Sequence, residues 1–301
     1  MTYHSVGPNG GAYPYLNRLS VDMFRRHMTF LKDRYEIVAL DEGLHRLHDG
    51  RLDDRAHPPQ PACPRRPLVA ITIDDGYGDV YDHIFPVLRS FDVPATVFLA
   101  TDYLDTGRLP WPTRIGAYLH AARLRSVDHP FRLTLDMPGG LSKAGRLLRE
   151  KLSLLDHGAR DAVFDDLRSA LDATELNPIP PLTWAQVRQM ARHRVQFGSH
   201  TCFHGWLDRL QSNEVEAELL VSKARIESET GVPCRLLAYP NGNWSPAVAE
   251  AAHRAAYGFA FAQDGSVAHR SITSAHSISR LDIPHDEGLG TFACRVTGLA
   301  L

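Results

Sequence analysis

The sequence is poor in cysteine and has no long hydrophobic run. Its 301 residues include four cysteines, which are far apart and lack C-x-x-C spacing. This pattern favours reduced thiols over a disulfide framework or a cysteine-rich zinc site. No apolar run approaches the roughly 18 residues that a membrane-spanning helix requires, so we expect no membrane span. The chain also opens without the basic segment and apolar stretch of a secretory signal, which predicts a cytoplasmic location.

A strong charge of either sign is also absent. The 33 Lys and Arg residues oppose 35 Asp and Glu residues, which gives a formal net charge of −2. A chain so nearly neutral has no overall field with which to hold nucleic acid, and we expect no such partner. The sequence also lacks internal repeats and low-complexity tracts.

What the sequence does contain is an alternation of predicted strands and helices. The run Pro67–Ile73 is apolar and β-branched, as expected for a parallel strand that is buried on both faces. A helical pattern and a second strand, Ala95–Ala100, follow it and complete a βαβ unit. Further strands are predicted at residues 195–199, 234–239 and 258–262, with helices at 183–193, 213–230 and 245–256. This order predicts an α/β fold, either a barrel or a doubly wound sheet.

Residues 102–182 interrupt this alternation. They contain charged helical segments around Trp111–Leu124 and Leu141–Leu171, and they far exceed the usual connection of about 2–6 residues. We therefore predict one domain over residues 1–301, with a helical insertion at roughly 102–182. Such an insertion would cover or border the mouth of the barrel and select the substrate without binding metal.

Three polar segments each follow the carboxyl end of a predicted strand, where open sheets and barrels place their active sites. They are Thr72–Gly76, His200–His204 and Tyr239–Gly242. The first contains Asp74 and Asp75, two carboxylates that cannot both be buried and charged without a metal ion or a basic partner. Because neighbouring residues of a strand point in opposite directions, we expect the two to have different roles.

The second segment contains His200 and His204. Their four-residue spacing carries little weight alone in a chain with 16 histidines, but their position after a strand would bring both imidazoles to one side. With Asp75 they would form a site of two nitrogen ligands and one oxygen ligand, with room for water, as catalytic zinc requires. We predict one divalent ion, with zinc favoured and cobalt, nickel or manganese able to replace it.

An Asp-Asp-Gly segment, a later His-x-x-x-His segment and a proline-containing turn, in this order, resemble the polysaccharide deacetylase family (carbohydrate esterase family 4, the NodB-homology domain). The likeness extends to Tyr3-His4-Ser5-Val6, to Leu182-Thr183-Trp184 and to Arg280-Leu281-Asp282, so it covers most of the chain. It implies a distorted (β/α) barrel, usually of seven strands. It also implies a metal-dependent hydrolase that removes an N-acetyl or related acyl group from an amino sugar.

The resemblance also assigns roles by position. It makes Asp74 the general base and makes Asp75, His200 and His204 the metal ligands. The backbone N–H of Asn241, which follows the proline of the third motif, would help to stabilise the oxyanion.

The sequence departs from the family pattern at two places. Many members have an arginine just before the proline turn, whereas Ala238 stands there, and Arg280 is the candidate that could orient the base instead. The family's late Leu-x-His, which supplies a general acid, is absent in that form. His285 and His276 are the nearest candidates, and His285 is our predicted acid, although a surface position suits either. His4, at the end of the first strand, could line the barrel mouth or satisfy a buried hydrogen bond.

The expected substrate is an acetylated amino sugar in a glycoconjugate, an oligosaccharide or a sugar metabolite. Trp244, just after the proline turn, could stack on a sugar ring or simply pack. Two other functions remain in contention. The same metal site could hydrolyse a non-sugar amide or a cyclic ureide, or the chain could be an inactive binding protein that keeps a structural metal.

Overall fold

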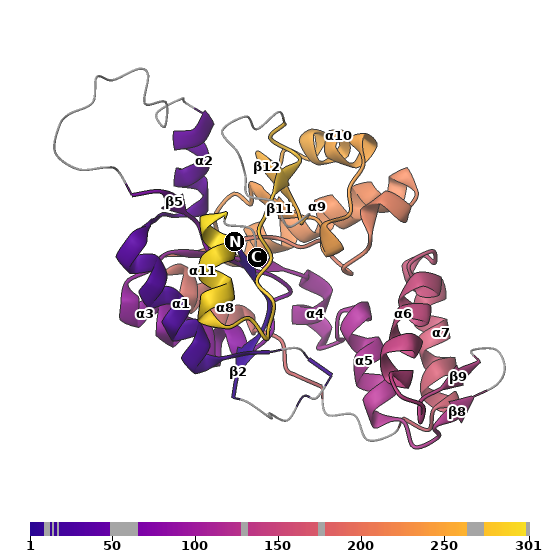
Figure 1. Cartoon of the computed structure of the whole chain (residues 1–301). Coiled ribbons are helices and arrows are strands. Elements are labelled where there is room, and N and C mark those ends of the chain that lie inside the picture. Colours follow the sequence, from indigo (N-terminus) through magenta and orange to yellow (C-terminus); the bar gives the residue numbers. More distant parts are fainter. Residues whose placement is uncertain are drawn as a thin grey trace, which may run out of the picture.

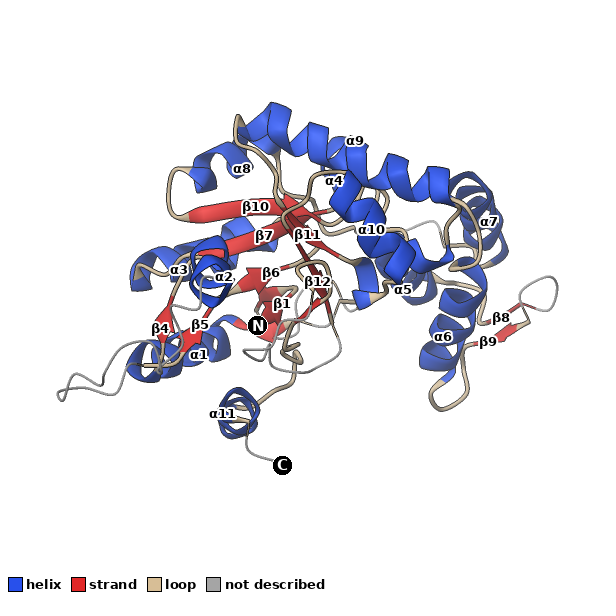
Figure 2. Ribbon diagram, turned by 90° about the horizontal axis from the view of Figure 1, so that it is seen from above, coloured by secondary structure: helices blue, strands red, loops and turns tan. Residues whose placement is uncertain are grey.

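The structure is a computed structural model that describes residues 1–8, 13, 15–16, 18–48, 66–127, 132–173, 178–263 and 274–298. Helices surround a curved sheet of short strands, and a separate group of helices stands at one side (Figures 1 and 2). Three cysteines, Cys202, Cys234 and Cys294, are free thiols, as predicted, and Cys63 lies outside the described residues. In the described part of the chain, no helix combines the length and the apolar character needed to cross a membrane.

The main sheet has seven strands, which are all parallel and follow the order β1-β6-β7-β10-β11-β12-β13. They are β1 (Thr2–Tyr3), β6 (Thr72–Ile73), β7 (Ala95–Leu99), β10 (Val195–Ser199), β11 (Leu236–Ala238), β12 (Phe259–Ala262) and β13 (Ile278–Ser279). Beyond β13, the N–H of Thr2 donates to the carbonyl of Leu281 at 2.7 Å, and the N–H of Ile283 donates to that of Thr2 at 3.0 Å. The chain after the last strand therefore pairs with the first strand, and the sheet curls around. This confirms the predicted (β/α)7-type barrel.

Helices pack around the barrel sheet and connect its strands. They are α1 (Val21–Arg34), α2 (Leu40–His48), α3 (Phe85–Phe91), α4 (Thr101–Thr106), α8 (Trp184–Ala191), α9 (Ser212–Thr230), α10 (Pro246–Arg254) and α11 (Leu289–Thr297). The three helices predicted between residues 183 and 256 are confirmed as α8, α9 and α10. The helix predicted after the Asp-Asp-Gly segment begins instead as a π-helix, Val80–Ile84, and continues as α3.

The strand predicted over Pro67–Ile73 is divided in two. Leu68–Val69 (β5) pairs with Glu36–Ile37 (β4), whereas Thr72–Ile73 pairs with β1 and β7 in the barrel. A continuous apolar run indicates burial on both faces but contains no information on which neighbour each half meets. Another short pair, β2 (Val6–Gly7) with β3 (Leu19–Ser20), lies beside the barrel sheet.

Residues 111–173 contain a second hydrophobic core. They form α5 (Trp111–Ala121), α6 (Gly140–Leu152), α7 (His157–Ala170) and a hairpin of β8 (Ser126–Val127) and β9 (Leu133–Thr134). Their buried apolar side chains, among them Leu148 and Phe164, form a cluster of their own, which Trp206 joins from the barrel. In Figure 1 this group, which includes β8 and β9, stands apart from the strands of the barrel. The boundaries 102–182 of the insertion stay a prediction.

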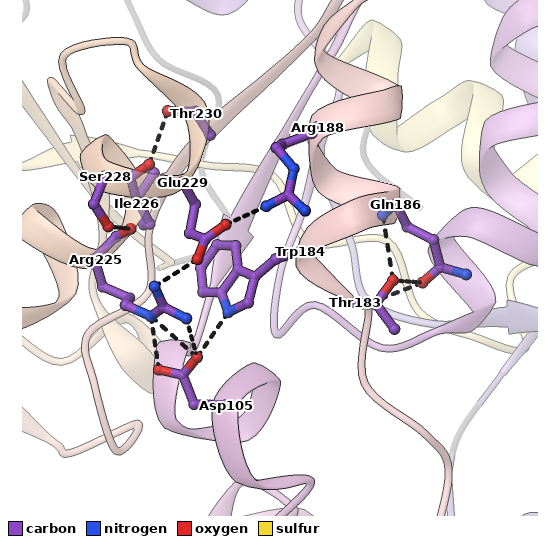
Figure 3. A network of polar contacts seen from close by, with 10 residues as sticks. All are labelled: Asp105, Thr183, Trp184, Gln186, Arg188, Arg225, Ile226, Ser228, Glu229 and Thr230. Atoms are coloured by element: carbon purple, nitrogen blue, oxygen red, sulfur yellow. Dashed lines mark hydrogen bonds and ion pairs between the residues drawn. The ribbon is translucent and has the colours of Figure 1, made fainter.

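A polar network fastens α4 to α8 and α9 on the outside of the barrel (Figure 3). Arg225 donates to the carboxylate of Asp105 through Nε at 2.9 Å and Nη2 at 2.7 Å, and Trp184 donates to the same carboxylate at 2.7 Å. Glu229 accepts from both Arg225 and Arg188. Because these groups are partly exposed, each ion pair contributes at most about 1 kcal/mol, and the network mainly fixes how the helices sit.

Candidate active site

The first segment of the site is a tight turn at the end of β6. Asp75 has a φ of 75° and Gly76 a φ of 83°, so two successive residues adopt the left-handed backbone conformation. That conformation is strained for a residue with a side chain, and such strain often occurs at functional sites. A side chain on Gly76 would also place its Cβ at 3.0 Å from Leu99. The turn gives Asp74 and Asp75 different partners.

Asp74 forms a buried, two-point ion pair with Arg280. Its Oδ1 accepts from Nη1 of Arg280 at 2.8 Å and its Oδ2 accepts from Nη2 at 2.7 Å. The two side chains are 1% and 3% exposed. Burial would raise the pKa of Asp74, but the adjacent guanidinium outweighs it and holds this pKa below the ordinary value. The structure thus brings together the predicted base and Arg280, although 205 residues separate them in the sequence.

Asp75, His200 and His204 lie together, are buried, and could hold a metal ion. Oδ1 of Asp75 is 3.5 Å from Nε2 of His200 and 3.3 Å from Nε2 of His204. Within the described residues this buried oxygen has no hydrogen-bond partner. An unpaired buried carboxylate oxygen is unfavourable by itself, so the arrangement fits a cation placed among the three side chains.

The protonation of His200 suits metal binding. Its Nδ1 is 2.8 Å from the carbonyl oxygen of Ala238, which can only accept, so Nδ1 carries the proton and the lone pair of Nε2 faces Asp75. Burial lowers the pKa of His200 to about 4, which keeps the imidazole neutral. A neutral imidazole is the form that binds metals.

Glu218, on α9, supports the loop that carries the two histidines. Its Oε2 accepts from the backbone N–H of Cys202 at 2.7 Å and from that of Phe203 at 2.9 Å. The loop needs support because Thr201 and His204 both have left-handed φ angles, 66° and 57°. Glu218 is not among the site residues predicted from the sequence. The available signal was an acidic residue on the buried face of a helix, in the register of Val215, Leu219, Ser222 and Ile226.

Replacing Glu218 should loosen the histidine loop. We expect Glu218→Ala to lower the free energy of unfolding by about 1–3 kcal/mol, because one buried and one partly buried backbone N–H group lose their acceptor. Loss of such outer support typically weakens metal binding about 10–100-fold. Glu218→Gln keeps one acceptor oxygen and should retain most of both properties. Urea denaturation and zinc titration would check this, and unchanged metal affinity in Glu218→Ala would remove Glu218 from the support of the site.

The third segment is the turn after β11. Asn241 has a φ of 57°, and Gly242 is held so close to Gln263 that an added Cβ would lie 2.6 Å from its backbone nitrogen. The side chain of Asn241 bonds to Asn243, which in turn donates to Asp208 at 3.1 Å and so links the turn to the histidine loop. The backbone N–H of Asn241 donates no hydrogen bond within the described residues.

A cavity of about 840 Å³ joins these groups to the inserted helices. Its wall includes His4, Asp75, His200, His204, Asn241 and Asp282 from the barrel, and Thr113, Arg146 and Arg149 from α5 and α6. A volume of this size lies within the range of about 300–1,000 Å³ that is typical of small-molecule sites.

Neither of the two histidines considered as a general acid lines the cavity. His285 is exposed and is not part of the cavity wall, and Nε2 of His276 is 2.8 Å from the carbonyl of Tyr257. His4 does line the cavity, where its Nδ1 is 3.8 Å from Oδ1 of Asp282. The barrel closure, which pairs β1 with the segment after β13, brings these two residues together.

Three aromatic residues lie near the turn or the cavity and differ in what they contact. Trp244 is 40% exposed and does not line the cavity, whereas Trp206 does. Tyr239 is fully buried, and its hydroxyl donates to the carbonyl of His276, so it faces away from the cavity. If a tryptophan contacts the ligand of this cavity, the geometry favours Trp206.

Comparisons with known proteins place the chain in a family. The family profile described as polysaccharide deacetylase matches residues 62–260. The protein named "Putative polysaccharide deacetylase YxkH" from Bacillus subtilis (strain 168) is 21% identical over 258 residues, which make up 85% of this chain and 61% of that protein. The chain therefore spans less than two thirds of the length of this relative.

Solved structures of deacetylases have the same fold. The Streptococcus pyogenes deacetylase PplD, solved with acetate, matches with a TM-score of 0.64 and 16% identity, over 97% of this chain and 95% of that chain. IcaB from Ammonifex degensii matches with 0.61 and 17%, over 98% and 94%. A de-N-acetylase from Aggregatibacter actinomycetemcomitans matches with 0.59 and 16%, over 98% of both chains.

Proposed function

Because the chain belongs to the polysaccharide deacetylase family, we propose that it hydrolyses the amide bond of an N-acetylated amino sugar and depends on one divalent metal ion. One observation carries the proposal. The buried group of Asp75, His200 and His204 lies next in sequence to Asp74, which forms an ion pair with Arg280. The group lies at the wall of a cavity that is large enough for a sugar.

The metal ion would be held by Asp75, His200 and His204. Two imidazole nitrogens and one carboxylate oxygen favour zinc, although cobalt, nickel or manganese suit the same ligands. When bound, such an ion polarises an amide carbonyl and makes water more acidic.

Asp74 would accept the proton of the attacking water. Its low pKa keeps it ionised at neutral pH, and the two-point contact with Arg280 fixes the direction of both oxygens. The same contact makes Asp74 a weaker base, because a general base works best when its pKa lies near the working pH. Asp74 therefore suits a water made more acidic, which is the chemistry that a metal ion held by Asp75, His200 and His204 would supply.

The remaining steps need a donor for the oxyanion and an acid for the leaving amine. The unpaired backbone N–H of Asn241 would donate to the developing oxyanion. We assign the acid to His4 instead of His285, because His4 lines the cavity and lies near Asp282, a carboxylate that can orient its ring.

A leaving-group test separates His4 from a structural role. We expect His4→Gln to lose about 10²–10⁴-fold in turnover on an acetamido sugar, since the amine must be protonated as it leaves. An acetate ester with a nitrophenol leaving group needs no such proton and should lose far less. His285→Gln serves as the matched control and should leave both rates unchanged. Equal losses of His4→Gln on amide and ester would contradict an acid role.

A substrate panel tests the proposed function directly. Acetate release should be measured from N-acetylglucosamine, its oligomers and acetylated glycoconjugates, with non-sugar amides and cyclic ureides alongside. We expect turnover on at least one acetylated amino sugar, its loss with a chelator and its return with zinc. Turnover on the ureides alone would move the protein to another amide substrate, and no turnover on any compound would contradict the proposal.

A further inference from the structure

The inserted helices bring guanidinium groups to the cavity that the proposed chemistry does not use. Arg146 and Arg149 lie three residues apart on α6, on neighbouring positions of one helix face, and both line the cavity. Arg209 lines it from the segment that follows His204. Within the part of the chain that the structure describes, none of the three forms an ion pair with a carboxylate.

Arg209 is held in a fixed position. Its Nη1 donates to the hydroxyl of Ser153, a buried residue at the C-terminal end of α6, and its guanidinium lies 4.8 Å from the ring centre of Trp206. Arginine stacks favourably on an aromatic face and keeps its remaining N–H groups free to donate. A cation that is already positioned loses less conformational entropy when it binds a ligand.

The charge on this side of the cavity is not balanced. Glu150 is the acidic residue that α6 contributes to the wall, so the three arginines leave an excess of two positive charges. The other acidic wall residues, Asp75 and Asp282, belong to the barrel, so over the whole wall three carboxylates match the three arginines, but the positive charge gathers on the side of the inserted helices. Exposed arginines without a partner are common on protein surfaces. These three differ because they line the same cavity, which concentrates their field.

We propose that the cavity takes an acetylated amino sugar that also carries an anionic group, a phosphate or a carboxylate, and that Arg146, Arg149 and Arg209 bind this group. The proposal rests on the proposed function, since it places the acetamido group at Asp75, His200 and His204. A guanidinium offers paired N–H donors that match the oxygens of a phosphate or a carboxylate. The cavity of about 840 Å³ has room for such a group beyond the reacting amide.

The test compares a neutral sugar with two anionic ones. Calorimetric titration would measure the binding of N-acetylglucosamine, N-acetylglucosamine 1-phosphate and N-acetylmuramic acid to the whole chain, with and without zinc. We expect at least one anionic sugar to bind about tenfold more tightly than the neutral sugar, the lower end of what charge-assisted hydrogen bonds supply. The advantage should persist without zinc and shrink as salt rises from about 0.05 to 0.5 M. The two anionic sugars show whether phosphate or carboxylate is preferred.

Matched variants locate the effect. The double variant Arg146→Gln/Arg149→Gln should lose the preference for the anionic sugar. Lys143→Gln/Lys151→Gln removes the same charge from exposed positions of the same helix that do not line the cavity, and should keep the preference. Equal affinity of the wild type for all three sugars, a preference that survives in the arginine variant, or one lost equally in the lysine variant would overturn the inference.

The same titrations separate this inference from the proposed function. Acetate release from neutral sugars together with equal affinities would contradict the anionic subsite alone. Tight, arginine-dependent binding of an anionic sugar without acetate release from any compound would support the subsite and contradict the deacetylase function.

Discussion

Asp74→Asn should keep the metal and lose about 10²–10⁴-fold in turnover, because an amide cannot accept the proton of the attacking water. Asp75→Ala should lose the metal and, with it, the activity. The contrast follows from the geometry, in which Asp75 faces two histidines and Asp74 faces Arg280. Zinc content and acetate release, measured on both variants, check the two expectations together.

An exposed aspartate provides the control for this pair. Asp82→Asn, on the π-helix that follows the turn, should leave both metal content and turnover unchanged. Loss of metal in Asp74→Asn together with its retention in Asp75→Ala would reverse the assignment. Turnover at the wild-type rate in Asp74→Asn would end the mechanism proposed here.

Arg280→Met is expected to lower the free energy of unfolding by about 3–5 kcal/mol, because it leaves the charge of Asp74 buried without a partner. It should also abolish turnover, since the carboxylate loses the contact that orients it. Arg280→Lys keeps the charge but not the two-point contact, so an intermediate result is expected. Urea denaturation and acetate release provide both measurements.

A double variant shows whether the unpaired charge is the cause. Asp74→Asn/Arg280→Gln removes both charges and should be more stable than Arg280→Met, because two neutral amides can bond to each other. If the double variant is no more stable than Arg280→Met, the destabilisation comes from lost packing of the arginine against its neighbours and not from the buried charge.

The parts of the fold that could be predicted from sequence are those with a local cause. The strand Val195–Ser199 and the helix Trp184–Ala191 follow from apolar periodicity and from the capping box formed by Thr183 and Gln186. The prediction of a single strand over Pro67–Ile73 was wrong, because the two halves of this run pair with different neighbours. Choice of neighbour is a tertiary property that the apolar run does not contain.

The same distinction holds for the site. The proximity of Asp75, His200 and His204 could be predicted, because each follows a strand and the carboxyl ends of parallel strands meet at one edge. The sequence offered Arg280 only as a candidate partner of Asp74, because their contact depends on how β13 lies in the closed barrel. The closure also brings His4 to Asp282, whereas the sequence pointed to His285 as the acid.

Metal-dependent acetate release by the wild-type chain tests the central claim most directly. Protein stripped of metal with a chelator should release no acetate from its acetylated sugar substrate. As zinc is added, activity should rise linearly and reach a plateau at about one ion per chain, the capacity of a site with three protein ligands. Full activity in the stripped protein, or one ion bound per chain without any acetate release, would contradict the account.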